Sequence, residues 1–186
     1  MNIANPESSD EYLIQATLAG DDGAFSLLVT RYKRRIFSLA ARFSRDNDEL
    51  EDICQEVFIK TYENLKSFRS DAPFEHWLTK VAVRACHDHL RSRRNRYKHT
   101  SIDEHELDFR DYAAESREGT RQAREVLYRA MALLKPDERL VITLLELEQY
   151  SVNEIADMTG WSSANVKVRA YRARQSLKRI LEKIDA

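Results

Sequence analysis

The chain has 186 residues, and its 30 lysines and arginines almost balance 31 aspartates and glutamates, for a formal net charge of −1. This length allows one large domain or two small ones, and the presence of only four glycines and three prolines favours a mostly helical fold. No apolar run approaches the roughly 20 residues that cross a bilayer. The N-terminus also lacks the basic, apolar and small-residue succession of a secretory signal, so we expect a cytoplasmic protein.

The first informative element is a helix predicted over residues 48–68. Its apolar stripe consists of Leu50, Ile53, Val57 and Thr61, with Cys54, Phe58 and Leu65 beside it. The opposite side carries Glu49, Asp52, Gln55, Glu56 and Glu63, with Ile59 among them. An acidic helix face is often only solvated, but an apolar residue within it favours a protein partner that has a complementary basic surface. Such a face repels DNA.

Residues 67–98 begin with a polar loop that contains Pro73 and continue as a helix that ends in a basic run. Helical spacing predicts a packed side made of Phe74, Trp77, Leu78, Val81, Ala82 and Ala85. The other side carries Arg84, His87, Asp88 and Arg91, followed by Arg93, Arg94 and Arg96. Trp77 is ordinarily a packing residue. Aromatic rings beside a loop and a basic helix also suit single-stranded DNA, whose bases stack while arginines follow its phosphates.

The two cysteines, Cys54 and Cys86, both fall in helical patterns. We therefore expect free buried thiols rather than a disulfide framework. Cys86 stands near His87 and His89, but a zinc site needs about four ligands, and no second Cys/His cluster stands nearby in the sequence. We expect no metal site and no cofactor.

Residues 101–118 contain seven acidic residues against Arg110 and Arg117 and show little apolar periodicity. Such a segment is typical of a solvated linker. It predicts an all-α protein of two small helical domains, 8–98 and 120–184, joined by a linker at 99–119. We expect this linker to be mobile in the free protein.

Residues 150–183 have the pattern of a helix-turn-helix. Ala156 lets the two helices approach closely, Gly160 accepts the left-handed backbone of a short turn, and Val166 anchors the second helix. Ser162 or Ser163 can cap that helix at its N-terminus. The buried stripe of the second helix is predicted to be Val166, Ala170, Ala173, Leu177 and Ile180.

The remaining surface of this second helix is strongly basic. It carries Lys167, Arg169, Arg172, Arg174, Lys178, Arg179 and Lys183, against which stands Glu182. Any amphipathic helix has a solvated side, but here turn chemistry precedes the basic side at the spacing of a DNA-binding motif. The pattern therefore predicts binding to duplex DNA.

Taken in order, four segments resemble a known family. They are "GDDGAFSLLVTRY", "DICQEVFIKTYENLKSFRSDAPFEHWL", "LKPDERLVITLLELEQYSVNEIADMTG" and "VKVRAYRAR". Their order and spacing resemble the extracytoplasmic-function (ECF, group IV) RNA polymerase sigma factors, above all the envelope-stress sigma factors of Gram-negative bacteria. The resemblance implies a dissociable subunit that brings core RNA polymerase to a promoter. One domain melts the minus-ten element and captures the non-template strand, and the other reads the minus-thirty-five duplex.

The resemblance, together with the surface patterns described above, assigns residues to these roles. Core polymerase binding falls to the helix face with Asp52, Gln55, Glu56 and Ile59. Minus-ten binding falls to Ser67, Phe68, Arg69 and Asp71 of the "SFRSDAPF" loop, with Trp77, Arg84, His87, Asp88 and Arg91 of the next helix. Minus-thirty-five binding falls to Ser163, Asn165, Lys167, Arg169, Tyr171, Arg172 and Arg174.

The sequence departs from the family at several of these positions. Arg84 stands where members often have Asn, Ala164 and Asn165 stand in place of Gly-Thr, and Val168 stands in place of Ser. These differences affect the expected promoter sequence more than the expected role. The family also implies an inhibitory anti-sigma factor as a partner, and it implies no catalysis, because the polymerase makes the phosphodiester bonds.

Two other functions remain open from the sequence. A helix-turn-helix regulator whose N-terminal helices bind a ligand or a second subunit explains residues 150–183 equally well, but leaves the acidic face around Ile59 unassigned. A nucleic-acid enzyme is disfavoured, because we find no phosphate-binding glycine loop, no nucleophile with an assigned base and no metal cluster.

Overall fold

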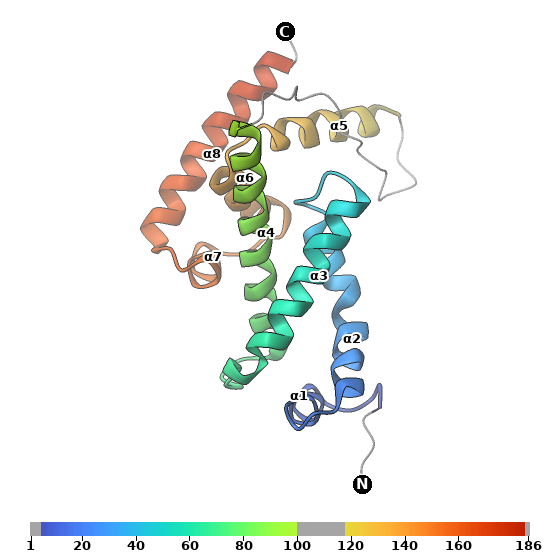
Figure 1. Cartoon of the computed structure of the whole chain (residues 1–186). Coiled ribbons are helices and arrows are strands. Elements are labelled where there is room, and N and C mark those ends of the chain that lie inside the picture. Colours follow the sequence, from blue (N-terminus) through green and yellow to red (C-terminus); the bar gives the residue numbers. More distant parts are fainter. Residues whose placement is uncertain (1–4, 100–117, 185–186) are drawn as a thin grey trace. The chain divides into compact units, whose positions relative to one another are not determined.

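The computed structural model describes residues 5–99 and 118–184, and all regular structure in these ranges is helical (Figure 1). The elements are α1 (Asp10–Leu18), α2 (Asp22–Ala40), α3 (Asn47–Asn64), η1 (Leu65–Ser67), α4 (Phe74–His99), α5 (Glu118–Ala132), α6 (Pro136–Ile142), η2 (Thr143–Leu147), α7 (Val152–Thr159) and α8 (Ser163–Ile184). The expected all-α fold is confirmed. The expected mobility of the acidic linker concerns residues that lie outside the described part of the chain.

The chain divides into two compact units, and the boundary between them falls inside α4, between Cys86 and His87. The first unit contains α1, α2, α3, η1 and the first half of α4. The second contains the remainder of α4 and the elements from α5 to α8.

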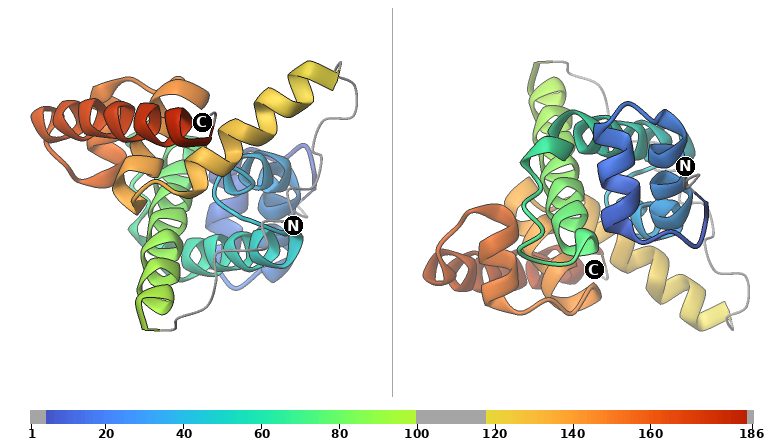
Figure 2. Two further views of the ribbon diagram at one scale, coloured as in Figure 1. Left: turned by 90° about the horizontal axis from the view of Figure 1, so that it is seen from above. Right: turned by 90° about the horizontal axis from the view of Figure 1, so that it is seen from below.

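In the first unit, α1 and α3 both pack against α2 (Figures 1 and 2). Each of these three helices begins with a side-chain cap, in which Ser9, Asp21 and Asp46 accept hydrogen bonds from backbone amides inside the first turn. The predicted stripe of α3 is buried at Leu50, Ile53, Val57 and Thr61. The helix therefore turns the predicted side toward the core.

Two charged residues that the sequence analysis placed with exposed groups, Glu49 and Arg93, are buried. Glu49 is only 7 % exposed, because its carboxylate accepts a hydrogen bond from the Arg45 backbone amide at 2.6 Å and pairs with the Arg45 guanidinium at 3.4 Å. It therefore closes the start of α3 and does not belong to the acidic face. Arg93 is also buried, as expected for a residue three positions after buried Leu90 on one helix.

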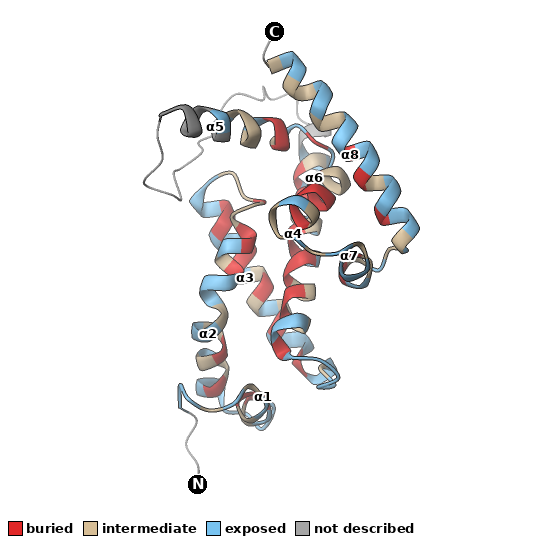
Figure 3. Cartoon of the chain, turned by 180° about the vertical axis from the view of Figure 1, so that it is seen from behind, coloured by how far each residue is buried: buried red, intermediate tan, exposed pale blue. Residues whose placement is uncertain are grey.

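In the second unit, α5, α6 and α7 all pack against α8 (Figure 1). The core is formed by Met131, Leu134, Ile142 and Ala173, with Leu127, Leu147, Leu177 and Ile180 packed against it. Figure 3 shows α8 as a mostly exposed helix interrupted by a few buried residues. A π-helical segment, η2, joins α6 to the loop before α7, and nothing in the sequence pattern predicted it.

The helix-turn-helix forms as predicted. Ser151 and Glu154 make a reciprocal capping box at the start of α7, and Gly160 ends that helix in the left-handed region at φ 76°. The Ser162 hydroxyl then accepts a hydrogen bond from the Asn165 amide at 3.2 Å. Fully buried Val166 anchors α8. The local sequence thus sets the direction in which α8 leaves the turn.

Gly160→Ala is expected to lower the free energy of unfolding of the second unit by about 1 kcal/mol. A Cβ at this position meets no atom within 4 Å, so the cost comes from the left-handed backbone rather than from a clash. Urea unfolding in a Trp77→Phe background measures it, because Trp161 is then the remaining tryptophan of the chain. Gly160→Asn is the matched control and costs less, since Asn tolerates this conformation. Equal stability of the Ala variant and the parent would contradict the explanation.

Candidate functional site

The predicted protein-binding face of α3 is present in the first unit. Asp52, Gln55 and Ile59 are exposed, and Glu56 is partly exposed. Ile59 is 49 % exposed, an unusual position for a large aliphatic side chain in a helix that has a well-packed opposite side. Glu56 pairs with Lys60 at 2.8 Å, so part of its charge is compensated within α3. The face therefore combines acidic groups with an apolar centre.

Tyr62 extends this face and was missed from the sequence. Its ring is 48 % exposed and lies edge-on to Phe25 at 5.0 Å. Its hydroxyl donates a hydrogen bond to Asp22 at 3.0 Å, and this bond raises the pKa of Tyr62. The signal available was its position three residues after Ile59, which places both on one side of a helix.

The loop between η1 and α4 is built on an aromatic cluster. Phe68 is half-buried, and its ring lies 5.5 Å from Phe74 and 5.7 Å from Trp77, measured between centroids. Phe74 also stacks on Trp77 at 5.7 Å. Phe68 and Trp77 therefore form part of the base of the loop.

The polar residues of this loop lie outside the cluster. Ser67, Arg69 and Asp71 are exposed, and the Ser67 hydroxyl donates to the backbone carbonyl of Asn64 at 2.7 Å. Between them, Ser70 takes a left-handed backbone at φ 58°, which is uncommon for a residue other than glycine. Because strained residues of this kind collect at binding sites, the loop is a candidate for ligand contact.

The predicted polar side of α4 is only partly exposed. Arg84, Asp88 and Arg91 are exposed, whereas His87 is half-buried. Within the second unit, His87 Nε2 lies 2.9 Å from Asp137 Oδ1. The His87 ring also lies edge-on to Trp161 at 5.6 Å. His87 therefore has a packing role in this structure.

The outer side of α8 carries most of the predicted duplex-reading residues. Asn165, Lys167, Tyr171 and Arg172 are exposed, and the Tyr171 side chain is 66 % exposed. Ser163 is half-buried and its hydroxyl donates to the Asn153 side chain at 2.9 Å, which links the starts of α7 and α8. The exposed residues form a basic surface with one aromatic ring.

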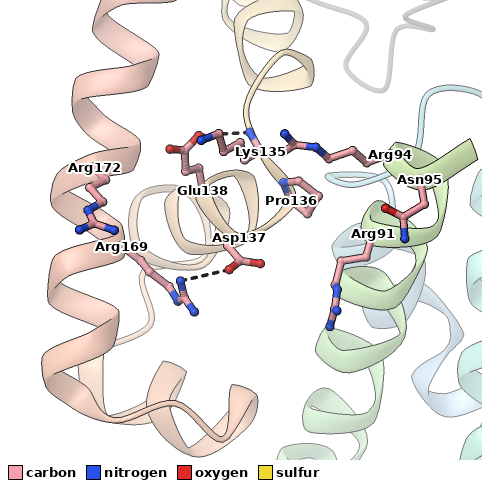
Figure 4. Close-up of a pocket in the computed structure, with 9 residues that line it drawn as sticks. All are labelled: Arg91, Arg94, Asn95, Lys135, Pro136, Asp137, Glu138, Arg169 and Arg172. Atoms are coloured by element: carbon pink, nitrogen blue, oxygen red, sulfur yellow. Dashed lines mark hydrogen bonds and ion pairs between the residues drawn. The ribbon is translucent and has the colours of Figure 1, made fainter. Parts of the chain in front are cut away.

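Arg169 and Arg174 differ from these residues, because their guanidinium groups contact the rest of the second unit. Arg169 pairs with Asp137 at 3.1 Å and lies 4.3 Å from the centroid of the Trp161 ring. Arg174 pairs with Glu146 at 2.7 Å. Figure 4 shows Arg169 directed toward Asp137. Both arginines therefore help to hold α8 in place.

A pocket of about 340 Å³ lies in the second unit, and Figure 4 draws the residues that line it. It is lined by Arg91, Arg94, Asn95, Lys135, Pro136, Asp137, Glu138, Arg169 and Arg172. Cationic side chains outnumber the two carboxylates, and Glu138 is already engaged by the Lys135 backbone amide and the Ser176 hydroxyl. The lining is therefore basic and polar.

Other kinds of site are not found in the part of the chain that the structure describes. No group of three or more His, Cys, Asp or Glu is arranged to hold a metal ion among residues 5–99 and 118–184. Cys54 and Cys86 are free and buried, and burial raises the pKa of the Cys54 thiol to about 12. Within the same ranges, no helix has the length and apolar character needed to cross a membrane.

Comparison with known families identifies both halves of the chain. Residues 28–96 match the family described as Sigma-70 region 2, and residues 124–177 match the family described as Sigma-70, region 4. The first match contains the α3 face and the aromatic loop, and the second contains the helix-turn-helix. Each candidate surface thus falls within a sigma-factor region.

Named relatives match over nearly the whole length. The chain is 30% identical over 184 residues to the RNA polymerase sigma-H factor of Pseudomonas aeruginosa, covering 95% of each chain. It is 32% identical over 177 residues to the ECF RNA polymerase sigma-E factor of Escherichia coli (strain K12), covering 91% of this chain and 92% of that relative.

Solved structures agree on the fold. A structure of CnrH in complex with the cytosolic domain of CnrY matches with a TM-score of 0.59 at 23% identity, covering 95% of this chain and 99% of that one. The sigma factor RpoE of Bartonella quintana, in complex with the anti-sigma factor NepR, matches with a TM-score of 0.60 at 20% identity, covering 85% and 96%. The chain therefore belongs to the sigma-70 family, in its extracytoplasmic-function group, and is a sigma factor that binds core RNA polymerase and directs promoter-specific initiation of transcription.

Proposed function

We propose that the two sigma regions divide the work of promoter engagement along the predicted domain bounds. Residues 8–98 bind core polymerase and open the minus-ten element, and residues 120–184 read the minus-thirty-five element. The observation that carries this proposal is the basic outer side of α8, because it lies opposite buried Val166, Ala170 and Ala173 and belongs to the second helix of a helix-turn-helix. A recognition helix in this motif enters the major groove of duplex DNA.

The polymerase contact is assigned to the α3 face. Asp52, Gln55, Glu56 and Ile59 supply acidic groups around an exposed apolar side chain, and Tyr62 enlarges the apolar part. An acidic surface repels the DNA phosphates and attracts a basic protein surface. Charge complementarity therefore favours binding of a protein partner, rather than DNA, to the α3 face.

The minus-ten contact is assigned to the aromatic loop and the exposed side of α4. Its residues are Ser67, Phe68, Arg69, Asp71, Trp77, Arg84, His87, Asp88 and Arg91. Taking a base out of the duplex costs on the order of a few kcal/mol. Stacking on an aromatic ring stabilises a displaced base by about 1–3 kcal/mol. Phe68 and Trp77 are partly exposed and can provide such rings. The loop therefore has the means to hold a displaced base of the non-template strand.

The minus-thirty-five contact is assigned to Ser163, Asn165, Lys167, Arg169, Tyr171, Arg172 and Arg174. Lys167, Tyr171 and Arg172 are the base- and phosphate-contacting members, because they are exposed and lie farther from the buried stripe of α8 than Arg169 and Arg174 do. Arg169 and Arg174 act chiefly by positioning α8, through their pairs with Asp137 and Glu146. This division follows from helical geometry, since Arg169 and Arg174 border the buried stripe.

Run-off transcription tests the proposal. Purified chain added to core polymerase is expected to give defined transcripts from a subset of the host's promoters, and core polymerase alone is expected to give none. A ligand-binding helix-turn-helix regulator would not co-purify with core polymerase, and that result would favour the alternative. A catalytic role is not proposed, and labelled DNA incubated with the chain and a divalent metal is expected to stay intact. Fractionation of host cells is expected to place the chain in the cytoplasm.

We also propose that an anti-sigma factor covers both regions at once. Two of the similar solved structures are complexes, one with the anti-sigma factor NepR and one with the cytosolic domain of CnrY. A partner that contacts two separate surfaces gains from the high effective concentration of the second contact. Addition of a purified anti-sigma factor is expected to block polymerase binding and promoter binding together. Retention of both activities in its presence would disprove the idea.

A further inference from the structure

An uncharged ridge with an apolar centre runs along the outermost side of α8. Successive residues of a helix are about 100° apart, so the side opposite the buried stripe can be read from the sequence. It consists of Ala164, Val168, Tyr171 and Gln175, which we call the outer ridge. Lys167 and Arg172 lie on the two sides of this ridge, and both are exposed.

Within the outer ridge, the exposure of Val168 has no explanation in the packing of its own unit. It is 48 % exposed, and it is one of six large apolar side chains that are exposed within residues 5–99 and 118–184. Tyr171, one helical turn later, is another. A β-branched residue is a poorer helix former than Lys, Arg or Gln, so neither folding nor solvation favours Val168 here.

The charges beside the ridge indicate what Val168 contacts. Lys167 and Arg172 flank it, so a surface that covers the ridge must be strongly anionic at its edges and apolar at its centre. The major groove of DNA has this arrangement, because phosphates line its rims and the C5-methyl group of thymine is the apolar group on its floor. An acidic protein is the competing occupant.

We infer that Val168 contacts the C5-methyl group of a thymine in the major groove and thereby selects thymine at one position of the minus-thirty-five element. This inference rests on the proposed role of α8 in reading that element. Lys167 and Arg172 supply affinity through the phosphates and neighbouring base edges, while Val168 supplies discrimination through a contact that polar groups cannot make. Val168 is thus a specificity-determining residue.

The test uses holoenzyme assembled from core polymerase and the full chain. Duplexes randomised in the minus-thirty-five element are selected with the wild-type chain and with Val168→Ala, which removes the two γ-methyl groups that reach farthest from the helix and also favours the helix. The wild type is expected to enrich thymine at a position where Val168→Ala shows no preference. Replacing that thymine with deoxyuridine removes one methyl group. This change is expected to weaken binding by the wild type roughly fourfold, the effect of one lost methyl contact.

Val168→Ala is expected to bind the thymine and deoxyuridine duplexes equally. Gln175→Ala is the matched control, because it truncates another residue of the outer ridge and is expected to keep the wild-type difference. Three results overturn the inference: no thymine in the selected element, equal binding of both duplexes by the wild type, or a thymine preference that persists in Val168→Ala. A wild-type holoenzyme that selects no sequence in this element at all contradicts the proposed role of α8 as well.

Discussion

Replacing Gln55 and Ile59 with Arg is expected to abolish assembly with core polymerase while leaving the first unit folded. Both side chains are exposed on α3, so the substitutions create no cavity and bury no charge. They place two positive charges where we propose that a basic partner surface docks. Like-charge contacts in an interface cost several kcal/mol, which corresponds to a loss of affinity of about a hundredfold or more.

A competition assay against the unmodified chain for limiting core polymerase measures this effect. The matched control is Gln15→Arg with Ser38→Arg, which adds the same charge at exposed positions of α1 and α2. This control is expected to compete normally. Helical content and cooperative melting of both double variants must equal those of the parent. Normal assembly by the Gln55 and Ile59 variant would show that the α3 face is not the polymerase contact.

Replacing Tyr171 and Arg172 with Ala is expected to leave holoenzyme assembly intact and to remove promoter selection. Each good base contact contributes about 1–3 kcal/mol of discrimination. Loss of two such contacts lowers the preference for promoter over other DNA by roughly a hundredfold. Because Tyr171 is 66 % exposed, its truncation removes little packing from the second unit.

Promoter footprinting beside a non-promoter duplex measures this discrimination. The control variant carries Lys178→Ala and Lys183→Ala, which remove exposed positive charges nearer the end of α8. We expect this control to weaken binding to all sequences equally, since phosphate contacts carry no sequence information. If the Tyr171 and Arg172 variant still protects its promoter selectively, the duplex-reading surface lies elsewhere.

The helix-turn-helix was predictable because its determinants are local. Gly160 is needed for the left-handed turn and Val166 for anchoring α8, and both are recognised from spacing alone. The α3 stripe was predictable for the same reason. Glu49 was assigned wrongly, because its burial depends on Arg45, which precedes the helix. Periodicity predicts the side of the helix on which a residue lies, but it does not predict a hydrogen-bond or ion-pair partner that buries the residue.

The roles of Arg169, Arg174 and Tyr62 could not be predicted, because they depend on contacts with other elements. Arg169 and Arg174 looked equivalent to Lys167 and Arg172 in the sequence. Asp137 and Glu146, which pair with these two arginines, come from α6 and η2. Tyr62 was missed because an aromatic residue in a helix is usually assigned to the core. Its ring contact with Phe25 comes from α2, and no pattern within α3 reveals that contact.

The intradomain pairs of Arg169 and Arg174 have a consequence for the ionic-strength dependence of promoter binding. The logarithm of a DNA association constant falls with the logarithm of salt concentration by about 0.9 for each phosphate that the protein neutralises, because condensed counterions are released. An arginine whose charge is already matched by Asp137 or Glu146 neutralises little additional phosphate charge. The α8 contribution to that slope should therefore be shallower than its number of basic residues suggests, and binding by this region should tolerate a rise in cellular salt correspondingly well.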